Sequence, residues 1–271
     1  MPERRGKLTV GSVRDIVKST CHLDGMNSGA CAGYPLARQM RDDPEGRCDM
    51  GGIEATSVRF SSAGRPACLL EGIITRPQDD APDALHAGVV LCHPQPASCT
   101  MDDGLVSLLA SELAERGLIT LRFNFRGVGS SEGQQTDGRL EPLDIAGAVN
   151  FLVQQEGINH DRVALIGHAF GAFMALTYAL HDTRIGLVVA VSPPVFRVAP
   201  GLGEFDRPKL FITGEFDEVA PRHKLEPWIE RLPNRALLVV SGARHLMRGY
   251  EDVAANTIVK YVARWAVAPG L

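Results

Sequence analysis

The sequence predicts an α/β protein: a mostly parallel sheet of about eight strands, doubly wound, with helices on both faces. Three observations lead to this prediction. Apolar stretches of strand length alternate with stretches of helical periodicity over most of the chain. The strand-like stretches are continuously apolar, which is typical of parallel strands covered on both faces. The first two are joined by Gly64-Arg65-Pro66, which predicts an antiparallel hairpin ahead of the parallel strands.

The elements follow one another at regular spacing. Strands are predicted at residues 53–62, 67–77, 86–93, 118–125, 162–167, 186–192, 209–214 and 236–242. Helices are predicted at residues 105–117, 141–155, 170–180 and 253–266. Residues 192–207 contain prolines and glycines and have no helical period, so we expect no large lid over the site.

The first 52 residues differ from the rest. Residues 1–52 are rich in Gly, Asp, Arg and Ser and have no sustained period, whereas residues 53–271 carry the regular pattern. The segment is interpreted as a flexible extension, or as an arm packed over the active-site mouth or a partner subunit. Met50 directly precedes the regular pattern, so a later gene start is a third interpretation.

Size and charge exclude several function classes. The chain has 271 residues, enough for one large domain, with a net charge of -4 and a pI near 6.1. This balance argues against nucleic acid or an anionic membrane as the main partner. No apolar run approaches the roughly 20 residues that span a bilayer, and charges interrupt the N-terminus where a signal peptide would be apolar. A cytoplasmic protein is expected.

The six cysteines do not predict a metal site. They form no C-x-x-C pair, and no histidine pair has zinc-ligand spacing. Cys68 and Cys92 lie in strand-like stretches and are expected to be small buried hydrophobes. A disulfide among Cys21, Cys31 and Cys48 is left open, although a cytosolic setting disfavours it.

A glycine-bracketed turn links one predicted strand to the next helix. Gly167-His168-Ala169-Phe170-Gly171 has the G-x-S-x-G frame, with alanine in the third position. This frame is typical of a sharp strand-to-helix turn that exposes its central residue, with small residues on either side. An ordinary strand–glycine–helix junction would show the same spacing, so the frame indicates an active site only together with the other motifs of the sequence.

Two later strand ends carry an acid and a histidine. Asp217 follows the strand at 209–214, and His245 follows the strand at 236–242. A carboxylate there can orient a histidine and stabilise its cationic form. The order of nucleophile position, acid and histidine is that of α/β-hydrolases. Glu215 and Glu218 are rival carboxylates, and a loop aspartate with a surface histidine is the alternative interpretation.

The segment His93-Pro94-Gln95-Pro96 follows the strand at 86–93. An oxyanion hole needs one N–H from the residue after the nucleophile, here Phe170, and one from this loop. The two prolines have no N–H, so Gln95 is the expected donor.

These motifs together resemble one family. HPQP, RFNFRGVGSSEG (122–133), GHAFG, GEFD (214–217) and ARH (243–245) resemble the small, lidless α/β-hydrolases related to dienelactone hydrolases, over residues 53–268. The resemblance implies an α/β-hydrolase fold and a carboxylesterase or thioesterase with a Ser–His–Asp triad. It implies that Asp217 and His245 are acid and base and that the Gln95 and Phe170 amides bind an oxyanion. RFNFRG is expected to fix a loop, with a substrate contact by Arg126 left open.

The chain departs from the family at Ala169, where the pattern has serine. Three explanations are compatible with the remaining residues. An engineered inactivation would leave every other part of the machinery in place. A natural lyase, cyclase or isomerase would use the His245–Asp217 pair as a general base. A ligand-binding relative would use the pocket without turnover.

Other nucleophiles are weaker candidates. Ser98 and Cys99 follow the HPQP segment, and Ser192 ends another strand, but each lacks the sharp turn. His168 is expected to pack locally. The resemblance implies a small-molecule acyl substrate and no metal or organic cofactor. The sequence does not determine the oligomeric state, and a homodimer is left open.

Overall fold

The computed structural model describes residues 47–49, 52–78, 86–95, 97–196 and 201–268. The predictions for the segment before residue 47, including Cys21 and Cys31, lie outside the described residues, as does Pro96. Within the described ranges one nine-stranded sheet has the order β1-β2-β3-β5-β4-β6-β7-β8-β9. The strands are β1 (Arg47–Asp49), β2 (Ile53–Ser61), β3 (Leu69–Pro77), β4 (His86–Cys92), β5 (Ile119–Phe123), β6 (Ile158–His168), β7 (Ile185–Val191), β8 (Lys209–Gly214) and β9 (Arg235–Val240).

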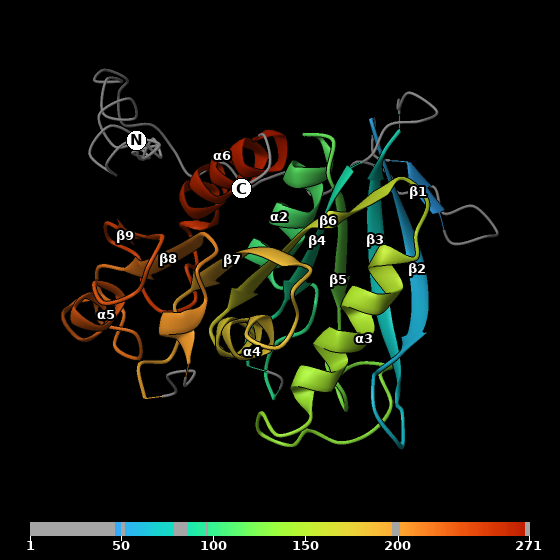
Figure 1. Ribbon diagram of the computed structural model, residues 1–271, viewed down its shortest axis with the longest axis horizontal. Helices are drawn as coiled ribbons and strands as arrows, with labels where there is room; N and C mark the ends of the chain where they lie inside the picture. The colour runs from blue at the N-terminus through green and yellow to red at the C-terminus, as the bar shows by residue number, and fades with distance from the viewer. Residues whose placement is uncertain (1–46, 50–51, 79–85, 96, 197–200, 269–271) are drawn as a thin grey trace, which may run out of the picture. The chain divides into compact units, whose positions relative to one another are not determined.

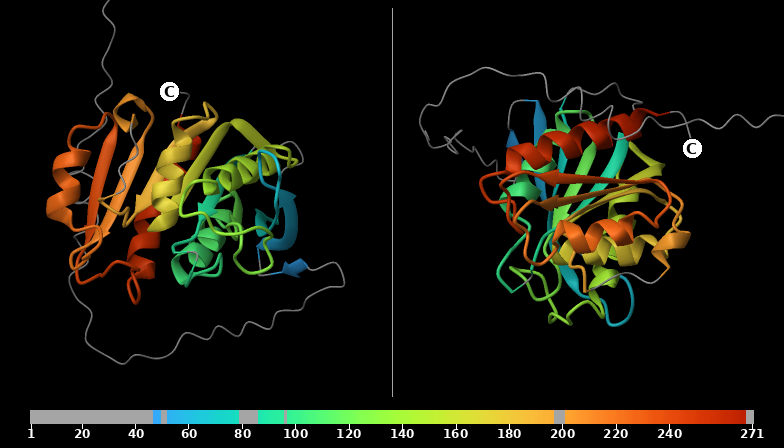
Figure 2. Two further views of the ribbon diagram at one scale, coloured as in Figure 1. Left: turned by 90° about the horizontal axis from the view of Figure 1, so that it is seen from below. Right: turned by 90° about the vertical axis from the view of Figure 1, so that its left-hand side faces the viewer.

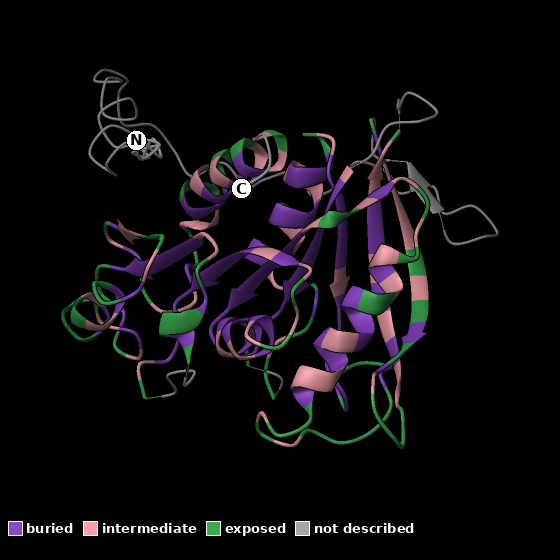
Figure 3. Ribbon diagram, viewed as in Figure 1, coloured by how far each residue is buried: buried purple, intermediate pink, exposed green. Residues whose placement is uncertain are grey.

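Helices cover both faces of the sheet (Figures 1 and 2). They are α2 (Gly104–Ala114), α3 (Glu141–Val153), α4 (Phe170–Ala179), α5 (Arg222–Ile229) and α6 (Glu251–Val267), with a short 3-10 helix at Leu202–Glu204. The buried side chains of α2 and α6 belong to one apolar cluster, and those of α3, α4 and α5 to a second cluster. The central strands between these layers are buried, whereas the outer faces of the helices are exposed (Figure 3).

The predicted α/β-hydrolase fold is confirmed. Strands β4 to β9 pair in parallel, and β2 and β3 form the expected antiparallel hairpin. The short strand β1, which lies within the segment assigned to the extension, pairs antiparallel with β2. No helix among the described residues is long and apolar enough to cross a membrane.

The strand order reverses at β4. The chain passes from β4 to β5 on one side and returns to β6 on the other side. At such a reversal the loops after neighbouring strands diverge, and ligands of open α/β sheets bind in the crevice beyond the carboxyl ends. The loop after β4 and the turn after β6 therefore meet at this edge.

Besides β1, which was not predicted and makes the sheet nine-stranded, two elements differ from the sequence-based prediction. Helix α5 was not predicted, because most of its residues are polar, it contains Pro227, and only Leu225 and Ile229 are buried. Strand β6 begins at Ile158, four residues before the predicted start, because Ile158 and Asn159 pair with the start of β4 before a register shift places Val163 opposite Gly88.

Candidate active site

The turn between β6 and α4 holds Ala169 in a strained backbone conformation. Its φ is 49° and its ψ is -111°, a region that residues other than glycine rarely occupy. The Ala169 N–H donates to the carbonyl of Val191 at 2.8 Å, and its carbonyl accepts from the amides of Ala172 and Phe173. The turn is therefore held by main-chain bonds on both sides, and its methyl group is almost fully buried.

Two glycines make this turn sterically possible. A Cβ on Gly167 would lie 2.2 Å from the carbonyl oxygen of Gly171, and a Cβ on Gly171 would lie 2.3 Å from the carbonyl oxygen of Cys92. Both obstacles are backbone atoms that a side chain cannot displace cheaply. The contact between Gly171 and Cys92 also brings the start of α4 against the end of β4, which leads into the loop of Gln95.

Asp217 and His245 meet across two neighbouring loops. Nδ1 of His245 lies 3.0 Å from Oδ1 and 3.1 Å from Oδ2 of Asp217. The carboxylate has no exposed surface, whereas 24% of the His245 side chain is exposed. Oδ1 also accepts the amides of Val219 at 2.9 Å and Ala220 at 2.7 Å. The acid is thus fixed by backbone donors, and the imidazole reaches the surface.

The surroundings of Asp217 keep it ionised. Burial alone would raise the pKa of this carboxyl, but the hydrogen bonds from His245 and the Ala220 amide outweigh burial and bring the pKa below its ordinary value. The rival acids face elsewhere. Glu215 accepts from Ser241 and the next amide, and Glu218 pairs with Arg244.

The loop after β4 is organised by a buried histidine. Burial lowers the pKa of His93 to about 4, so its ring is neutral near pH 7. Its Nε2 accepts the amide of Phe125 at 3.2 Å, which leaves Nδ1 as the donor to the Pro94 carbonyl at 2.8 Å. The carbonyl of the exposed residue Gln95 accepts the amides of Ser98 and Cys99, which closes a tight turn.

Among the described residues, the weaker nucleophile candidates make no hydrogen bond to His245. The Oγ of Ser192 is completely buried at the end of β7 and has no well-aligned partner among the described residues. It contributes to the lowered pKa of Asp217, so it lies beside the acid and away from solvent. Among the described residues, the contact recorded for the side chains of Ser98 and Cys99 is with each other, at 3.8 Å.

Arg126 has a structural role. Its guanidinium donates to both carboxylate oxygens of Asp144, with the shortest contact at 2.6 Å, and both side chains are buried. A buried guanidinium that is paired with a buried carboxylate favours the loop-fixing role over a substrate contact.

Sequence reasoning missed one residue beside the turn. Asp103 directly precedes α2, where an aspartate normally caps the helix, but its side chain makes no capping bond. Its Oδ1 lies 3.3 Å from Nδ1 of His168 instead. An aspartate before a helix gives no sequence signal of such a contact.

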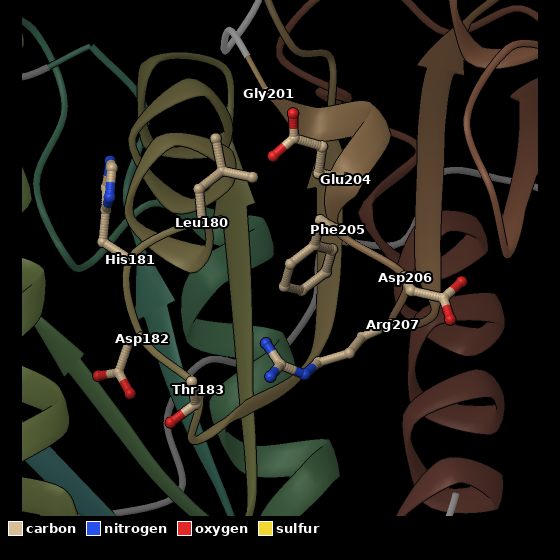
Figure 4. A pocket seen from close by; sticks show the side chains of 9 residues that line it. All are labelled: Leu180, His181, Asp182, Thr183, Gly201, Glu204, Phe205, Asp206 and Arg207. Atoms are coloured by element: carbon tan, nitrogen blue, oxygen red, sulfur yellow. The ribbon is translucent and has the colours of Figure 1, made fainter.

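Two surface hollows lie away from these residues. One involves α2 and α6 and is lined by Glu112, Asp252, Val253 and Asn256. The other lies at the end of α4 opposite the turn (Figure 4) and is lined by Leu180, His181, Asp182, Thr183, Gly201, Glu204, Phe205, Asp206 and Arg207. Neither contains Ala169, Asp217 or His245.

The fold and these contacts define an α/β-hydrolase-type arrangement, in which a strand-to-helix turn, an acid and a histidine converge at one sheet edge. Comparison with known families agrees. The model described as "Alpha/beta hydrolase family" matches residues 89–270, more than half of the chain, and the protein belongs to this family.

Individual relatives extend the match. An uncharacterised protein of Rickettsia prowazekii is 27% identical over 184 residues, which cover 64% of this chain and 77% of that protein. A thiohydrolase of Arthrinium phaeospermum is 28% identical over 175 residues, which cover 61% of this chain and 55% of that protein. Among solved structures, an alpha-beta serine hydrolase homologue from Coxiella burnetii is 30% identical, with a TM-score of 0.65, covering 75% of this chain and 96% of that chain.

Proposed function

We propose that this site binds a small carboxylic ester or thioester, with His245 and Asp217 as the proton-transfer pair and Ala169 in the place of the nucleophile. One observation carries the proposal. The buried Asp217 accepts from Nδ1 of His245 at 3.0 Å, at the edge of the sheet where the strained turn also lies. The similarity to a thiohydrolase supports an acyl substrate.

The geometry supports specific roles. Because Asp217 engages Nδ1, Nε2 of His245 is the nitrogen left to exchange a proton with the reacting atoms, and the carboxylate stabilises the imidazolium that forms. The N–H of Phe170 belongs to the first turn of α4, where backbone donors have no partner within the helix. Together with the N–H of Gln95, it is the proposed donor to an oxyanion.

The absence of a hydroxyl at position 169 sets the expected rate of hydrolysis. In a form with serine at position 169, Oγ would attack the acyl carbon while Nε2 of His245 takes its proton and then passes that proton to the departing alcohol or thiol. A water molecule, deprotonated by the same Nε2, would then attack the acyl-serine and release the acid, and the proton would return to Oγ. Removing such a nucleophile lowers turnover by about 10⁶-fold. The chain as written is therefore expected to bind acyl compounds and to hydrolyse them very slowly.

Restoring the hydroxyl tests the proposal. We expect Ala169→Ser to gain hydrolysis of p-nitrophenyl acetate or of an acyl thioester by several orders of magnitude, and Ala169→Ser/His245→Asn to lose that gain. An engineered alanine predicts this result. No gain in a correctly folded Ala169→Ser protein would falsify the hydrolase assignment.

A second candidate is a non-hydrolytic enzyme that uses the same pair as a general base. It is compatible with Ala169, because the Asp217–His245 pair is formed and a general base needs no nucleophile at position 169. For a lyase, cyclase or isomerase, His245→Asn should abolish turnover of a substrate that is not an ester. Unchanged ligand affinity without turnover in either form would instead indicate a binding protein.

A further inference from the structure

A second histidine lies next to the strained turn. His168 is the last residue of β6 and is buried, with 2% of its surface exposed. Its Nδ1 lies 3.3 Å from Oδ1 of Asp103, and its Nε2 lies 3.3 Å from the backbone carbonyl oxygen of His245. The ring therefore spans the gap between two loops that come from distant parts of the chain.

Both neighbours of this ring are hydrogen-bond acceptors. A backbone carbonyl only accepts, and so does an ionised carboxylate, so each contact needs a proton on the ring side or between the two atoms. A neutral imidazole carries one N–H. Both bonds can form together only when a second proton is present, which gives an imidazolium beside the Asp103 carboxylate.

The carboxylate of Asp103 is placed for this contact. Asp103 occupies the N-cap of α2, yet its side chain does not cap the helix, and only 13% of it is exposed. Its neighbour Asp102 pairs with Arg122, so the two aspartates serve different partners. The Asp103 side chain thus contacts the buried ring of His168 instead of capping α2.

We propose that His168 is a positioning residue, which donates from both ring nitrogens and so holds the backbone of His245 against the turn at Ala169. The inference deepens the proposed function and rests on it, since it concerns how the base of that same site is held. Asp217 fixes the ring of His245, and His168 fixes its main chain. With both points fixed, the imidazole is restrained in translation as well as in rotation.

Several charged or titratable groups lie around the ring of His168. The Asp103 carboxylate faces Nδ1. The residue that contacts Nε2 through its backbone carbonyl is His245, which carries a titratable imidazole of its own. His93 lies near enough for Asp103 to favour its charged form, and a carboxylate oxygen of Glu251 lies 3.6 Å from where Gly104 would carry a Cβ. Among the described residues, the Asp103 carboxylate and the His245 carbonyl are the two groups that contact the ring nitrogens.

Nitrogen NMR of the full-length protein tests the proton count directly. With ¹⁵N-labelled histidine at pH 6, we expect two protonated ring nitrogens for His168, and one in Asp103→Asn, where the amide can turn to donate to Nδ1. The ring signals of His245 should shift in His168→Leu and His168→Gln but not in the control His181→Leu, because His181 is exposed at the far end of α4. A single protonated nitrogen in the unsubstituted protein overturns the proposal.

Steady-state kinetics provide a second test of the positioning role of His168. In the Ala169→Ser background, His168→Leu should lower kcat about 10- to 100-fold with KM within twofold, as expected when a base is misplaced by a fraction of an ångström. His168→Gln, which keeps one donor, should recover part of the loss, and His181→Leu should change nothing. Equal kcat in the Ala169→Ser and Ala169→Ser/His168→Leu proteins refutes the positioning role. If Ala169→Ser itself is inactive, the proposed function fails, and the NMR result still decides the placement of His168.

Discussion

Replacing Gly171 by alanine should loosen the junction that joins the turn to the loop after β4. The added Cβ would lie 2.3 Å from the carbonyl oxygen of Cys92 and 2.6 Å from that of His93. Moving the first contact out to 3.0 Å, the shortest separation that real Cβ atoms show, requires a shift of 0.7 Å between α4 and β4. Both obstacles are main-chain oxygens at the buried end of β4, and backbone atoms cannot rotate away as a side chain can.

Two effects oppose each other in this substitution. Alanine favours a helix over glycine by about 1 kcal/mol, whereas forcing extra volume into a packed site typically costs about 1–3 kcal/mol or more. Because the contacts are with rigid backbone, we expect the clash to dominate and the free energy of unfolding to fall by about 2 kcal/mol. With a urea m-value of about 2 kcal/mol/M, the unfolding midpoint should fall by about 1 M.

Urea unfolding followed by circular dichroism measures this change, and the chain offers a matched control. Gly203 lies in the 3-10 helix at Leu202–Glu204, and a Cβ there would have no atom within 4 Å. Gly203→Ala should alter stability by less than about 0.5 kcal/mol. A Gly171→Ala protein as stable as the Gly203→Ala protein would show that the contact between α4 and the β4 loop is looser than argued.

Two further predictions concern buried ionisable groups. The folded-state pKa of His93 is lowered from 6.5 to about 4, so the unfolded chain binds the extra proton first as the pH falls. The free energy of unfolding should therefore drop by about 3 kcal/mol between pH 6.5 and 4. In a plot of urea midpoint against pH, His93→Gln should flatten this drop, and an unchanged drop contradicts the assignment. Arg126→Met leaves Asp144 buried without its partner and should lower the free energy of unfolding by about 3–5 kcal/mol. The double substitution Arg126→Met/Asp144→Leu should recover much of this loss. A double mutant that is no more stable than Arg126→Met counts against this account.

Most of the fold follows from patterns that depend on burial. Strands β4, β7 and β8 are apolar almost throughout because helices cover both of their faces, and this produces the continuous runs by which the sequence predicts them. Helix α5 gives no such signal because it rests on the sheet through few side chains. The sequence does not reveal the early start of β6 either, since residues 159–162 are polar and none of them is fully buried.

The candidate site was predictable where chemistry follows the strand ends. Asp217 and His245 were expected from their places after β8 and β9, and the structure brings them together. The contacts of Asp103 and Ser192 were not, because each depends on the direction in which a side chain turns within its loop. A helix-capping aspartate and one facing a buried histidine look alike in sequence.

The turn at Ala169 is shaped entirely by groups other than its own side chain. Gly167 and Gly171 allow the close approach, and main-chain bonds to Val191 and to the first turn of α4 hold the backbone. None of these contacts uses the Ala169 side chain. Under the proposed function, a single codon change between alanine and serine would add or remove the attacking oxygen without breaking any of the main-chain bonds that hold the turn.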